Sequence, residues 1–453
     1  MKRRLERYLE DVNKKIESNK RFNTLKREFK NKNVSDKDLK IIGVTGSRGK
    51  TTVAYIIHEY LKSCGYKSML YSSLGIDSPS SIYRKYEACD LAISNKENIS
   101  SMLEETKKYE ADYLVIEVNE SNMHLLKDMP MDVRVLTNFT SLHNSELYSE
   151  EEYKKLKLSF FKDVYNDDCV CVLGVGTMMT KEDYDDFYKC NNCKKVTFGT
   201  KHICEVRGID YKKIDVLLHE LKSNTNGLEM DVLIGNRNKK FNTKTLLAHN
   251  SINYVTTIAS LIALEVFDET KFQKCIKNLL IPGREELINV NGRKIVIGMF
   301  LNPALENFKE YKNNKEIKNI KVVTGSVGTG FKNWSNEFKS EEFINTRKTS
   351  REYAMKIVDQ YADYAYLTEC DNAKEDVLDI CKELQGYLVN TPNKVVLDRK
   401  EAIKQAIIES QEGDLIFIAG RGNRKLLCYS EDKCKVFKDK DVVEKVLKEI
   451  GWM

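Results

Sequence analysis

The residues best suited to chemistry lie in one short turn, Thr45–Thr52, which contains two glycines and a lysine. A largely apolar run, Ile41–Val44, precedes the turn, and a stretch with helical periodicity follows it. A strand, a turn with exposed backbone N–H groups and a helix N-terminus together form a cradle for phosphate. In such a cradle Lys50 would lie along the β- and γ-phosphates, and the Thr51 hydroxyl would bind Mg²⁺. The turn therefore predicts binding of ATP or a close relative.

The other residues of the turn support this prediction. Gly46 and Gly49 stand where a Cβ atom would block the close approach of an anion. The spacing is shorter than in the usual G-x4-G-K-[ST] loop, because Val44 occupies the position of the first glycine. An ordinary strand–helix turn is the alternative interpretation. The residues that we expect to contact the nucleotide here are Gly46, Ser47, Arg48, Gly49, Lys50, Thr51 and Thr52.

Polar residues also follow the ends of two later apolar runs. Glu117 lies near the end of Tyr113–Val118. A buried carboxylate is costly unless it meets a cation, and Mg²⁺ on the nucleotide phosphates would supply one. A capping or ion-paired role is the alternative for Glu117. Asn138 and His143 follow the next run and present an amide and an imidazole, and we expect Asn138 to contact the nucleotide.

Two predicted helices carry further candidates. Lys157 lies on a helix predicted to begin at Glu150, and Asn250 and Asn253 open another helix. Two amides at the start of a helix would be able to read the edge of a purine. Each of these residues alone would more often be structural, so the prediction of a site depends on their order along the chain.

The distribution of apolar runs predicts an α/β fold. Short strand-like runs alternate with helical stretches from residue 41 to about residue 275, which is typical of a parallel sheet covered by helices. The strands predicted there are Ile41–Thr45, Ser68–Ser73, Tyr113–Val118, Val133–Thr137 and Cys169–Leu173, and the helices are Thr51–Ser63, Asn98–Tyr109, Glu150–Lys162 and Ile252–Val266. A second series has strands at Lys294–Ile297, Ile320–Thr324, Ala365–Thr368, Lys394–Leu397 and Leu415–Ala419, with helices at Ser350–Tyr361 and Arg399–Ser410.

The turn Ile281–Arg284 contains Pro and Gly and marks the predicted hinge between two α/β domains. We expect a basic helical segment at residues 1–40, an ATP-binding central domain with a P-loop at 41–280, and a Rossmann-like C-terminal domain at 281–453. Ligands of such sheets bind beyond the carboxyl ends of the strands, so the candidate residues after Thr45 and Val118 should lie together.

The composition of the 453-residue chain is that of a globular protein, with 41% hydrophobic and 31% charged residues. No window reaches the apolar length of a membrane span, and the N-terminus is charged where a signal peptide would be apolar. The 12 cysteines are scattered, so we expect reduced thiols and a cytoplasmic location. Cys190 and Cys193 would be half of a zinc site, but no second C-x2-C follows, and we interpret them as free thiols.

Positive charge is concentrated at the N-terminus. Residues 1–40 hold 14 Lys and Arg against 7 Asp and Glu, a local charge of +7, so the remainder of the +6 chain sums to −1. Apolar residues recur there at helical spacing, which predicts amphipathic helices docked on the neighbouring domain. A nucleic-acid or membrane role is the weaker interpretation, and a protein partner for this segment is an open alternative.

As a set, these motifs resemble the Mur ligases, ATP-dependent enzymes that join amino acids to a carboxylate, and within them the branch that adds the third residue to UDP-MurNAc-L-Ala-D-Glu. The turn Thr45–Thr52 is similar to the family's TGTNGKTT loop. Glu117-Val-Asn-Glu-Ser is similar to EVSSH, whose Glu binds magnesium. Thr137–His143 resembles TNLSRDH, whose His binds a second metal ion, and Lys157 falls where the family carries a carbamylated lysine.

The resemblance continues to about residue 425. Asn250 and Asn253 fit the HNxxN motif on the adenine side, and a hinge motif adds Arg284 to the expected nucleotide contacts. The segments Asp398–Ile403 and Gly413–Gly422 resemble DRAEAI and GDVVLVAGKG.

The incoming amino acid would be bound by the last domain. Cys370–Lys374 is similar to SDNPR, with Lys374 in place of the arginine that binds the amino acid. The resemblance thus implies substrate roles for Asp371, Asn372 and Lys374. Arg351 is a further candidate for binding the carboxylate of the amino acid.

Several segments depart from the family. The segment before the turn is much shorter than the family's UDP-sugar domain, and Asn98–Ser101 replaces its TTP substrate motif. Gly298–Pro303 lacks the Asp and His of DYAHTP, and Asn423-Arg424 replaces a His-Glu pair. We therefore expect that ATP chemistry is retained and that substrate recognition has changed.

The resemblance implies an ATP-dependent carboxylate–amine ligase that works through an acyl phosphate, with two Mg²⁺ ions and a CO₂-derived carbamate on Lys157. Its partners would be small-molecule carboxylate and amine substrates, on a cell-wall peptide precursor in the first interpretation. The alternatives are a ligase like folylpolyglutamate synthase, an amidating ligase on a substrate without UDP, and a catalytically inactive ATP-binding scaffold.

Overall fold

The computed structural model describes residues 39–77, 102, 105, 106, 108–120, 122–127, 129–140, 149–162, 164, 168–176, 179–328, 341–430 and 433–453, and only the backbone of 341–347. The predicted N-terminal helices, the Asn98–Ser101 segment and His143 lie outside the described residues. No helix in the described part of the chain is both long and apolar enough to cross a membrane.

The chain forms two compact units. The first contains the chain up to Leu221 together with Glu229–Asn242 and Asn250–Asn278. The second contains Lys222–Leu228, Thr243–His249 and Leu279–Met453. Two segments that the sequence placed in the central domain thus cluster with the second unit, and the predicted division at residues 40 and 280 stays a prediction.

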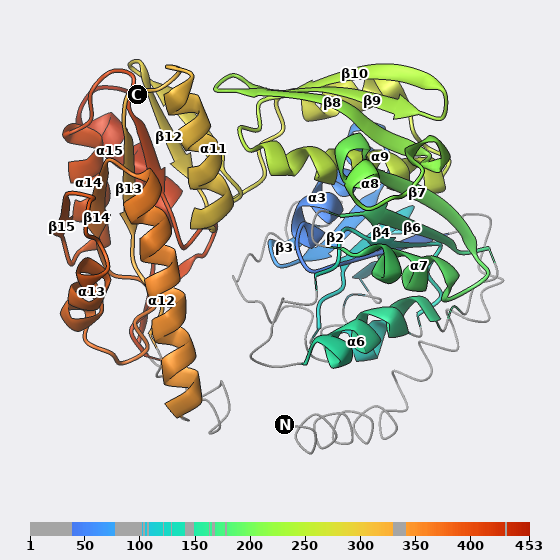
Figure 1. Cartoon of the computed structure of the whole chain (residues 1–453), viewed down its shortest axis with the longest axis horizontal. Helices are drawn as coiled ribbons and strands as arrows, with labels where there is room; N and C mark the ends of the chain where they lie inside the picture. Colours follow the sequence, from blue (N-terminus) through green and yellow to red (C-terminus); the bar gives the residue numbers. More distant parts are fainter. Residues whose placement is uncertain are drawn as a thin grey trace. The chain divides into compact units, whose positions relative to one another are not determined.

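A ten-stranded sheet forms the centre of the first unit, in the order β10-β9-β8-β7-β6-β5-β1-β4-β2-β3 (Figure 1). Its strands are β1 (Lys40–Thr45), β2 (Ser68–Ser72), β3 (Gly75–Asp77), β4 (Tyr113–Glu117), β5 (Val133–Leu136), β6 (Val170–Val175), β7 (Lys194–Thr200), β8 (Val216–Asn224), β9 (Gly227–Ile234) and β10 (Arg237–Thr243). Strand β1 pairs in parallel with both β4 and β5. The carboxyl ends of these three strands therefore lie at one edge of the sheet.

Helices cover this sheet. They are α3 (Lys50–Ser63), α5 (Met123–Leu126), α6 (Glu150–Lys162), α7 (Lys181–Lys189), α8 (Lys201–Val206), α9 (Ser251–Ala263) and α10 (Glu269–Ile276), with the short turns η2 (Tyr211–Lys213) and η3 (Ala248–Asn250). Helix α3 packs on α9 and β2, and α7 packs on β6. Strands β1, β2, β4 and β5 are almost wholly buried because helices cover them, which is why they are mainly apolar.

The second unit contains a six-stranded sheet in the order β11-β12-β16-β13-β14-β15. Its strands are β11 (Glu286–Val290), β12 (Arg293–Ile297), β13 (Ile320–Thr324), β14 (Tyr364–Leu367), β15 (Asn393–Val395) and β16 (Leu415–Ile418), beside a hairpin of β17 (Leu426–Cys428) and β18 (Cys434–Val436). Its helices are α11 (Leu301–Asn313), α12 (Glu341–Tyr361), α13 (Val377–Gly386), α14 (Arg399–Ile408) and α15 (Asp439–Glu449). The predicted α/β fold with two parallel-rich sheets is confirmed.

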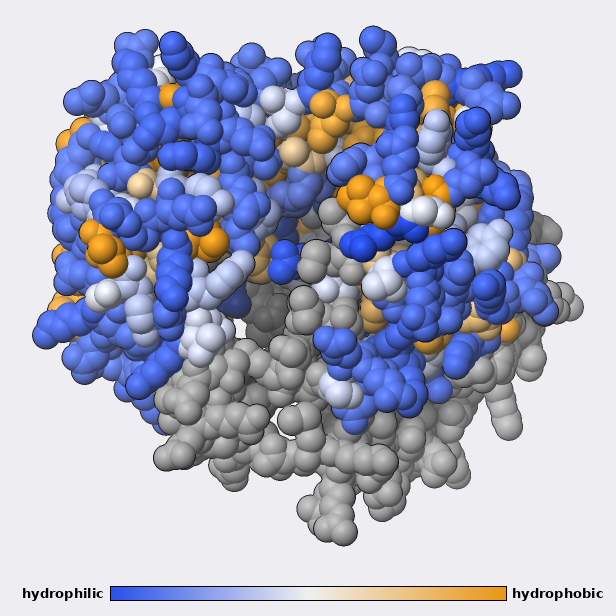
Figure 2. Space-filling view, in the orientation of Figure 1, coloured by the Kyte–Doolittle hydropathy of each residue, from blue (hydrophilic) through white to orange (hydrophobic). Residues whose placement is uncertain are grey.

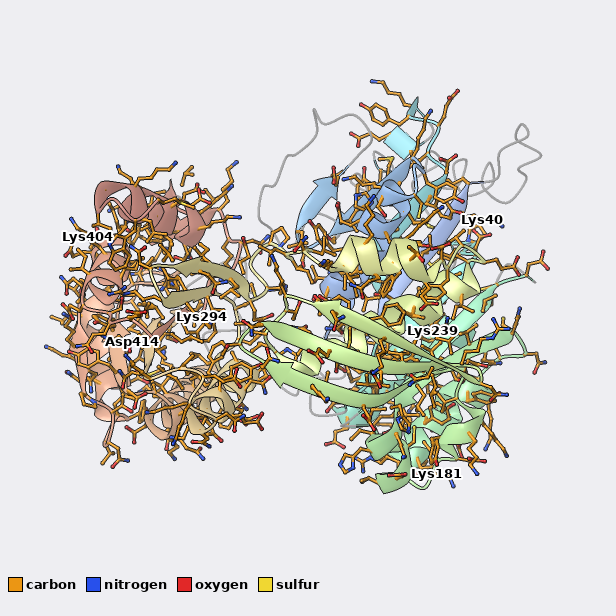
Figure 3. The ribbon with its side chains drawn as sticks, turned by 90° about the horizontal axis from the view of Figure 1, so that it is seen from above. Lys40, Lys181, Lys239, Lys294, Lys404 and Asp414 are labelled. Carbon is orange, nitrogen blue, oxygen red and sulfur yellow. A yellow bond between two sulfur atoms is a disulfide. The ribbon has the colours of Figure 1, made fainter. Side chains whose placement is uncertain are left out.

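The amino edges of both sheets carry charged side chains. Figure 3 marks Lys40 at the start of β1, where its ammonium lies 3.0 Å from Asp132. It also marks Lys294, near the start of β12, and Asp414, directly before β16. The backbone N–H of Lys294 donates to the carbonyl oxygen of Asp414 at 3.0 Å, so these two residues lie side by side at the amino edge of the second sheet. On the face drawn in Figure 2 the described surface is largely hydrophilic, with small separate hydrophobic patches. The carboxyl edges hold the candidate functional residues.

Candidate functional site

The turn after β1 requires glycine at two positions. Gly46 has φ of 146° and Gly49, which caps the start of α3, has φ of 81°. A Cβ on Gly46 would lie 2.1 Å from Thr137 Oγ1, and one on Gly49 would lie 2.3 Å from Asn253 Oδ1. At both positions the missing Cβ makes room for neighbouring protein atoms, so the glycines are required for close packing of the turn, and the expected clash of a Cβ with an anion stays a prediction.

The loop that follows β5 holds this turn. Asn138 accepts the Ser47 N–H at its carbonyl oxygen, at 3.1 Å, and the Arg48 N–H at Oδ1, at 2.9 Å. Thr137 donates its hydroxyl to the carbonyl oxygen of Arg48 at 2.5 Å. Asn138, predicted to contact the nucleotide, therefore fixes the shape of the turn through its bonds to the backbone of Ser47 and Arg48.

The N-terminus of α3 is open to an anion. Val53 donates the first bond of the helix, to the carbonyl oxygen of Gly49 at 2.9 Å, so the N–H groups of Lys50, Thr51 and Thr52 have no acceptor in a preceding turn. The Lys50 ammonium folds back on the turn and donates to the carbonyl oxygen of Gly46 at 2.9 Å. Together with the helix dipole these groups would bind a phosphate chain.

Glu117 meets the start of α3 from the end of β4. Its Oε1 accepts the Thr51 hydroxyl at 2.9 Å, and its Oε2 accepts the N–H of Ser73 at 2.7 Å. The hydroxyls of Thr51 and Ser73 lie 2.9 Å apart. A carboxylate and two hydroxyls at a helix N-terminus are oxygen ligands of the kind that Mg²⁺ prefers, so these residues fit the ion that the sequence predicted.

Lys157 is buried next to the same strands. Its Nζ lies 2.5 Å from Glu120 and donates to Thr45 Oγ1 at 3.2 Å, and its side chain has 0% exposure. The Tyr153 hydroxyl, one helical turn earlier, lies 3.1 Å from Glu120 Oε1 and 3.2 Å from Ser47 Oγ. Neither Glu120 nor Tyr153 was predicted from the sequence.

Charge and burial act against each other in this group. Burial lowers the pKa of Lys157 to about 8, although the Glu120 carboxylate acts in the opposite direction. Burial also opposes ionisation of Glu120, but the charges of Lys157 and Lys50 outweigh it and lower the pKa of that carboxyl to about 2. Lys50, Glu120 and Lys157 are therefore near enough to influence one another.

The two amides predicted to contact a purine lie at the start of α9. Asn253 donates its Nδ2 to Asn250 Oδ1 at 2.9 Å, and both residues are buried. The Asn253 amide lies beside Gly49, since a Cβ there would meet it. The Asn253 amide thus adjoins the turn, and Asn250 is hydrogen-bonded to it.

Outside this edge, a second polar group connects α3 with β2 and β3. His58 Nδ1 lies 2.9 Å from Ser68 Oγ, and its Nε2 lies 3.2 Å from Asp77. Lys62 also donates to Asp77, at 3.0 Å. Burial would raise the pKa of Asp77, but the bonds from His58 and Lys62 hold it well below its usual range. Because the Lys62 ammonium already provides a positive charge beside Asp77, we interpret these side chains as stabilising the fold rather than as ligands of a metal ion.

In the second unit, Arg351 is bound by protein carboxylates. Its guanidinium donates to Glu375 at 2.9 Å and to Glu383 at 2.7 Å, and also to the carbonyl oxygen of Val327 at 3.1 Å. The arginine is 3% exposed. A substrate carboxylate would have to displace one of these partners, which weakens the expectation that Arg351 binds substrate.

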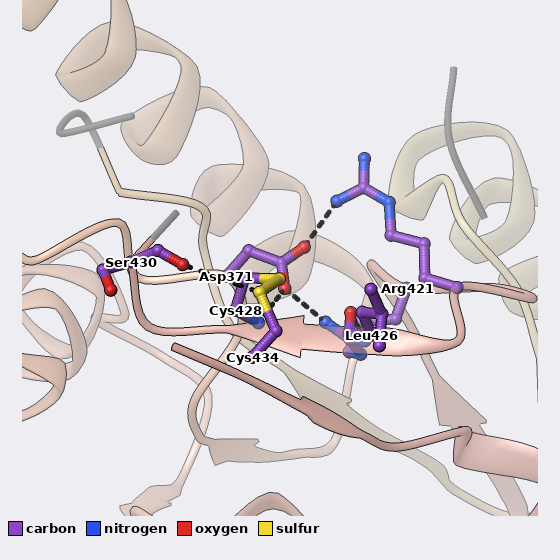
Figure 4. Close-up of a disulfide and its surroundings, with 7 residues drawn as sticks. Asp371, Arg421, Leu426, Cys428, Ser430 and Cys434 are labelled. Carbon is purple, nitrogen blue, oxygen red and sulfur yellow. Dashed lines mark hydrogen bonds and ion pairs between the residues drawn. A yellow bond between two sulfur atoms is a disulfide. The ribbon is translucent and has the colours of Figure 1, made fainter. Parts of the chain in front are cut away.

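Asp371 lies among donors at the end of β14. Its Oδ1 accepts Arg421 Nη1 at 2.8 Å and the Cys428 N–H at 3.0 Å (Figure 4). Its Oδ2 accepts Arg424 Nη1 at 2.8 Å. Lys374 adopts a φ of 70° and donates its N–H to the carbonyl oxygen of Tyr429 at 2.7 Å. The hairpin β17–β18 thus supports the predicted substrate loop.

Asn372 and Arg284 are the remaining candidates in this unit. Asn372 donates its Nδ2 to the carbonyl oxygen of Glu375, and its Oδ1 is buried without a hydrogen-bond partner in the described structure. Arg284 Nη1 lies 3.1 Å from Met299 Sδ, and its guanidinium lies 5.8 Å from the Phe300 ring centroid. The nucleotide role of Arg284 stays a prediction.

The expectation that the cysteines are all reduced is wrong for one pair. Cys428 and Cys434 form a disulfide across the β17–β18 ladder, because they are direct partners in its register (Figure 4). Cys190 and Cys193 are free thiols in the structure. Spacing along the sequence did not reveal the pair because nothing in it specified a hairpin there.

Comparison with known proteins supports this assembly of motifs. Residues 44–261 match the Mur ligase middle domain. The chain is 24% identical over 421 residues to the UDP-N-acetylmuramoyl-L-alanyl-D-glutamate–2,6-diaminopimelate ligase of Geobacillus thermodenitrificans, covering 91% of this chain and 79% of that protein.

Two solved structures share the fold. The MurF ligase from Thermotoga maritima in complex with ADP has a TM-score of 0.60 and 16% identity, covering 95% of this chain and 84% of that one. Folylpolyglutamate synthase from Thermotoga maritima has a TM-score of 0.61 and 15% identity, covering 88% of this chain and 89% of that one. The resemblance drawn from the motifs is confirmed: residues 44–261 match the middle domain of the Mur ligases, and the chain is similar over 91% of its length to the Geobacillus ligase.

Proposed function

We propose that this ligase joins an amine to the carboxylate of a small molecule, with ATP bound at the turn Thr45–Thr52. The observation that carries the proposal is the meeting of Thr51 and Glu117 at the N-terminus of α3, 2.9 Å apart and beside Lys50. A hydroxyl, a carboxylate and an ammonium at an open helix end provide ligands for a divalent ion and for a phosphate chain.

The protein's contribution is positioning and charge neutralisation. Lys50, released from the carbonyl oxygen of Gly46, would reach the β- and γ-phosphates, while the N–H groups that begin α3 hold their oxygens. Thr51 and Glu117 would hold Mg²⁺, whose charge makes the γ-phosphorus easier to attack by a carboxylate. The carboxylate would attack the γ-phosphorus and displace ADP, which gives an acyl phosphate. The amine would then attack the acyl carbon, and loss of phosphate and a proton would leave the amide.

A second ion at His143 and a carbamate on Lys157 are finer predictions from the resemblance. His143 lies outside the described residues. Lys157 is buried beside Thr45 and Glu120.

The amine would be bound by the second unit. Asp371, Asn372 and Lys374 are our candidates, because a buried carboxylate, an amide and an exposed lysine follow the end of β14. Arg421 and Arg424 already engage Asp371 through both of its oxygens. Asp371 would therefore shape the loop, and Asn372 and Lys374 would be the groups available to the substrate.

The identity of the carboxylate is the open part of the proposal. The relative's name points to a UDP-linked cell-wall peptide precursor, which we take as the first candidate. A substrate without UDP is the second candidate, because folylpolyglutamate synthase shares the fold over most of both chains. The segment Gly298–Pro303, without the Asp and His of the family, keeps an inactive ATP-binding scaffold as the non-enzymatic alternative.

Phosphate release separates these functions. The purified full chain would be incubated with ATP, Mg²⁺ and panels of carboxylates and amines, including UDP-linked precursors and folates. We expect phosphate release that requires both a carboxylate and an amine. Nucleotide binding with no amine-dependent phosphate release across the panels would contradict the ligase function and favour the scaffold.

A further inference from the structure

One acidic side chain of the nucleotide edge has no counterpart in the family motif. Glu120 stands where EVSSH has its second serine. Its carboxylate lies 2.5 Å from Lys157 Nζ and 3.1 Å from the Tyr153 hydroxyl. The lysine that the resemblance expects to be modified therefore already faces a protein carboxylate.

The two partners differ in how accessible they are. The Lys157 side chain is 0% exposed, whereas that of Glu120 is 15% exposed. Tyr153 and Lys157 are four residues apart on α6 and share one face of the helix. The Tyr153 hydroxyl also lies 3.2 Å from Ser47 in the nucleotide turn. Tyr153 and Lys157 thus hold the Glu120 carboxylate next to that turn.

A carbamate on Lys157 fits these surroundings poorly. It forms when the ammonium loses a proton, the neutral amine adds CO₂ and a second proton leaves, so that a cation becomes an anion with two added oxygens. The Nζ atom is already within hydrogen-bond distance of Glu120 and Thr45, and it lies 5.3 Å from the Tyr153 ring centroid. The new oxygens would have to displace these groups, and the ion pair would become a contact between like charges.

We propose that Lys157 remains an unmodified ammonium and that Glu120 supplies the carboxylate oxygens that the resemblance assigns to a lysyl carbamate. Glu120 is then a further residue of the cation and phosphoryl site, and Lys157 and Tyr153 position it. This inference rests on the proposed function, because it assigns a role in the same nucleotide site.

The state of Lys157 is measured without any variant. The full chain would be equilibrated with ¹³C-bicarbonate and examined by ¹³C NMR. We expect no carbamate resonance that appears with bicarbonate and disappears when it is removed. Such a resonance on the wild-type chain, lost in Lys157→Met, would overturn the inference, and this readout does not depend on whether the chain is an active ligase.

The role of Glu120 is tested by Mn²⁺ binding in the presence of ATP, followed by electron paramagnetic resonance. We expect Glu120→Gln to weaken Mn²⁺ binding by about tenfold or more. The matched control is Glu151→Gln, a carboxylate on α6 whose side chain is 77% exposed, and it should bind as the wild type does. Wild-type Mn²⁺ affinity in a folded Glu120→Gln would overturn the inference. If Glu120→Gln does not fold, the Glu120→Gln/Lys157→Met double variant removes both charges and takes its place.

Rescue by small acids distinguishes the two mechanisms by activity. If Glu120 supplies the carboxylate, formate or acetate should restore phosphate release at least tenfold in Glu120→Ala and not in Lys157→Met. The opposite pattern would overturn the inference and support a carbamate. A wild-type chain that binds no ATP would contradict the proposed function itself, whereas the NMR result would still decide whether Lys157 is modified.

Discussion

Replacing Glu117 by glutamine removes one negative charge from the nucleotide edge with almost no change in shape. Glu117 is 4% exposed and accepts bonds from Thr51 at 2.9 Å and from Ser73 at 2.7 Å. Glutamine keeps a carbonyl oxygen for Ser73, and it also ends the burial of a charge. We therefore expect the free energy of unfolding to change by about 1 kcal/mol or less.

The effect on the bound nucleotide should be much larger. A unit charge about 4 Å from another interacts by about 4 kcal/mol at an effective dielectric constant of about 20. An ion coordinated by Glu117 would be divalent and nearer than about 4 Å, which strengthens the attraction. The free energy needed to remove water from the ion and the carboxylate offsets part of that attraction. About 3 kcal/mol of net loss corresponds to a roughly 100-fold weaker Mg²⁺-dependent affinity for ATP.

Calorimetric titration of a non-hydrolysable ATP analogue, with and without Mg²⁺, measures this difference. Thermal unfolding of the same samples shows whether the variant is folded. Glu151→Gln again serves as the control, because that carboxylate is exposed and contacts Lys155 on the same helix. A folded Glu117→Gln that binds the Mg²⁺ complex within twofold of the wild type would refute the assignment of Glu117 to the ion.

Three further outcomes test the structure more widely. Gly49→Ala should lower the free energy of unfolding by about 2 to 3 kcal/mol and abolish ATP binding, because alanine is strained at φ of 81° and its Cβ meets Asn253 Oδ1. A variant with the unfolding free energy of the wild type, measured by denaturant unfolding, would contradict this. A carboxyl whose pKa is lowered by folding stabilises the fold above its unfolded pKa and loses that contribution as the pH falls. Asp77→Asn should therefore show a smaller loss of unfolding free energy than the wild type below about pH 4. The same dependence of unfolding free energy on pH in variant and wild type would exclude this role of Asp77. The disulfide closes a short loop with a sequence separation of 6, so Cys428→Ser/Cys434→Ser should lower the unfolding free energy by about 2 kcal/mol and make it insensitive to dithiothreitol; continued sensitivity to that reductant would contradict the assignment.

The sequence predicted the fold where apolar runs were continuous. Strands β1, β4 and β5 are almost wholly buried, so most of their residues are apolar, although Glu117 in β4 and Arg134 in β5 are buried charged residues. Their positions were correct to within a residue or so. Helix α6 was predicted with its observed bounds, Glu150–Lys162. Strands β8, β9 and β10 were missed, because they are partly exposed and mix charged with apolar residues.

The site was predictable as far as it follows local motifs. Thr51 and Glu117 stand at the ends of predicted elements, and β1–β4 pairing brings them together. Glu120 and Tyr153 were missed because their contact depends on α6 packing beside the turn after β1, which no sequence spacing encodes. One signal was present: Glu120 is a charged residue three positions after Glu117, where the similar motif has a serine.

The most direct test is a crystal structure of the full chain with Mg²⁺ and a non-hydrolysable ATP analogue. We predict that the triphosphate lies on the N–H groups that begin α3, with an ion bound by Thr51 and Glu117 at about 2.1 Å. A nucleotide bound elsewhere, or Glu117 still bonded to Thr51 and Ser73 with no ion between them and the phosphates, would contradict the account.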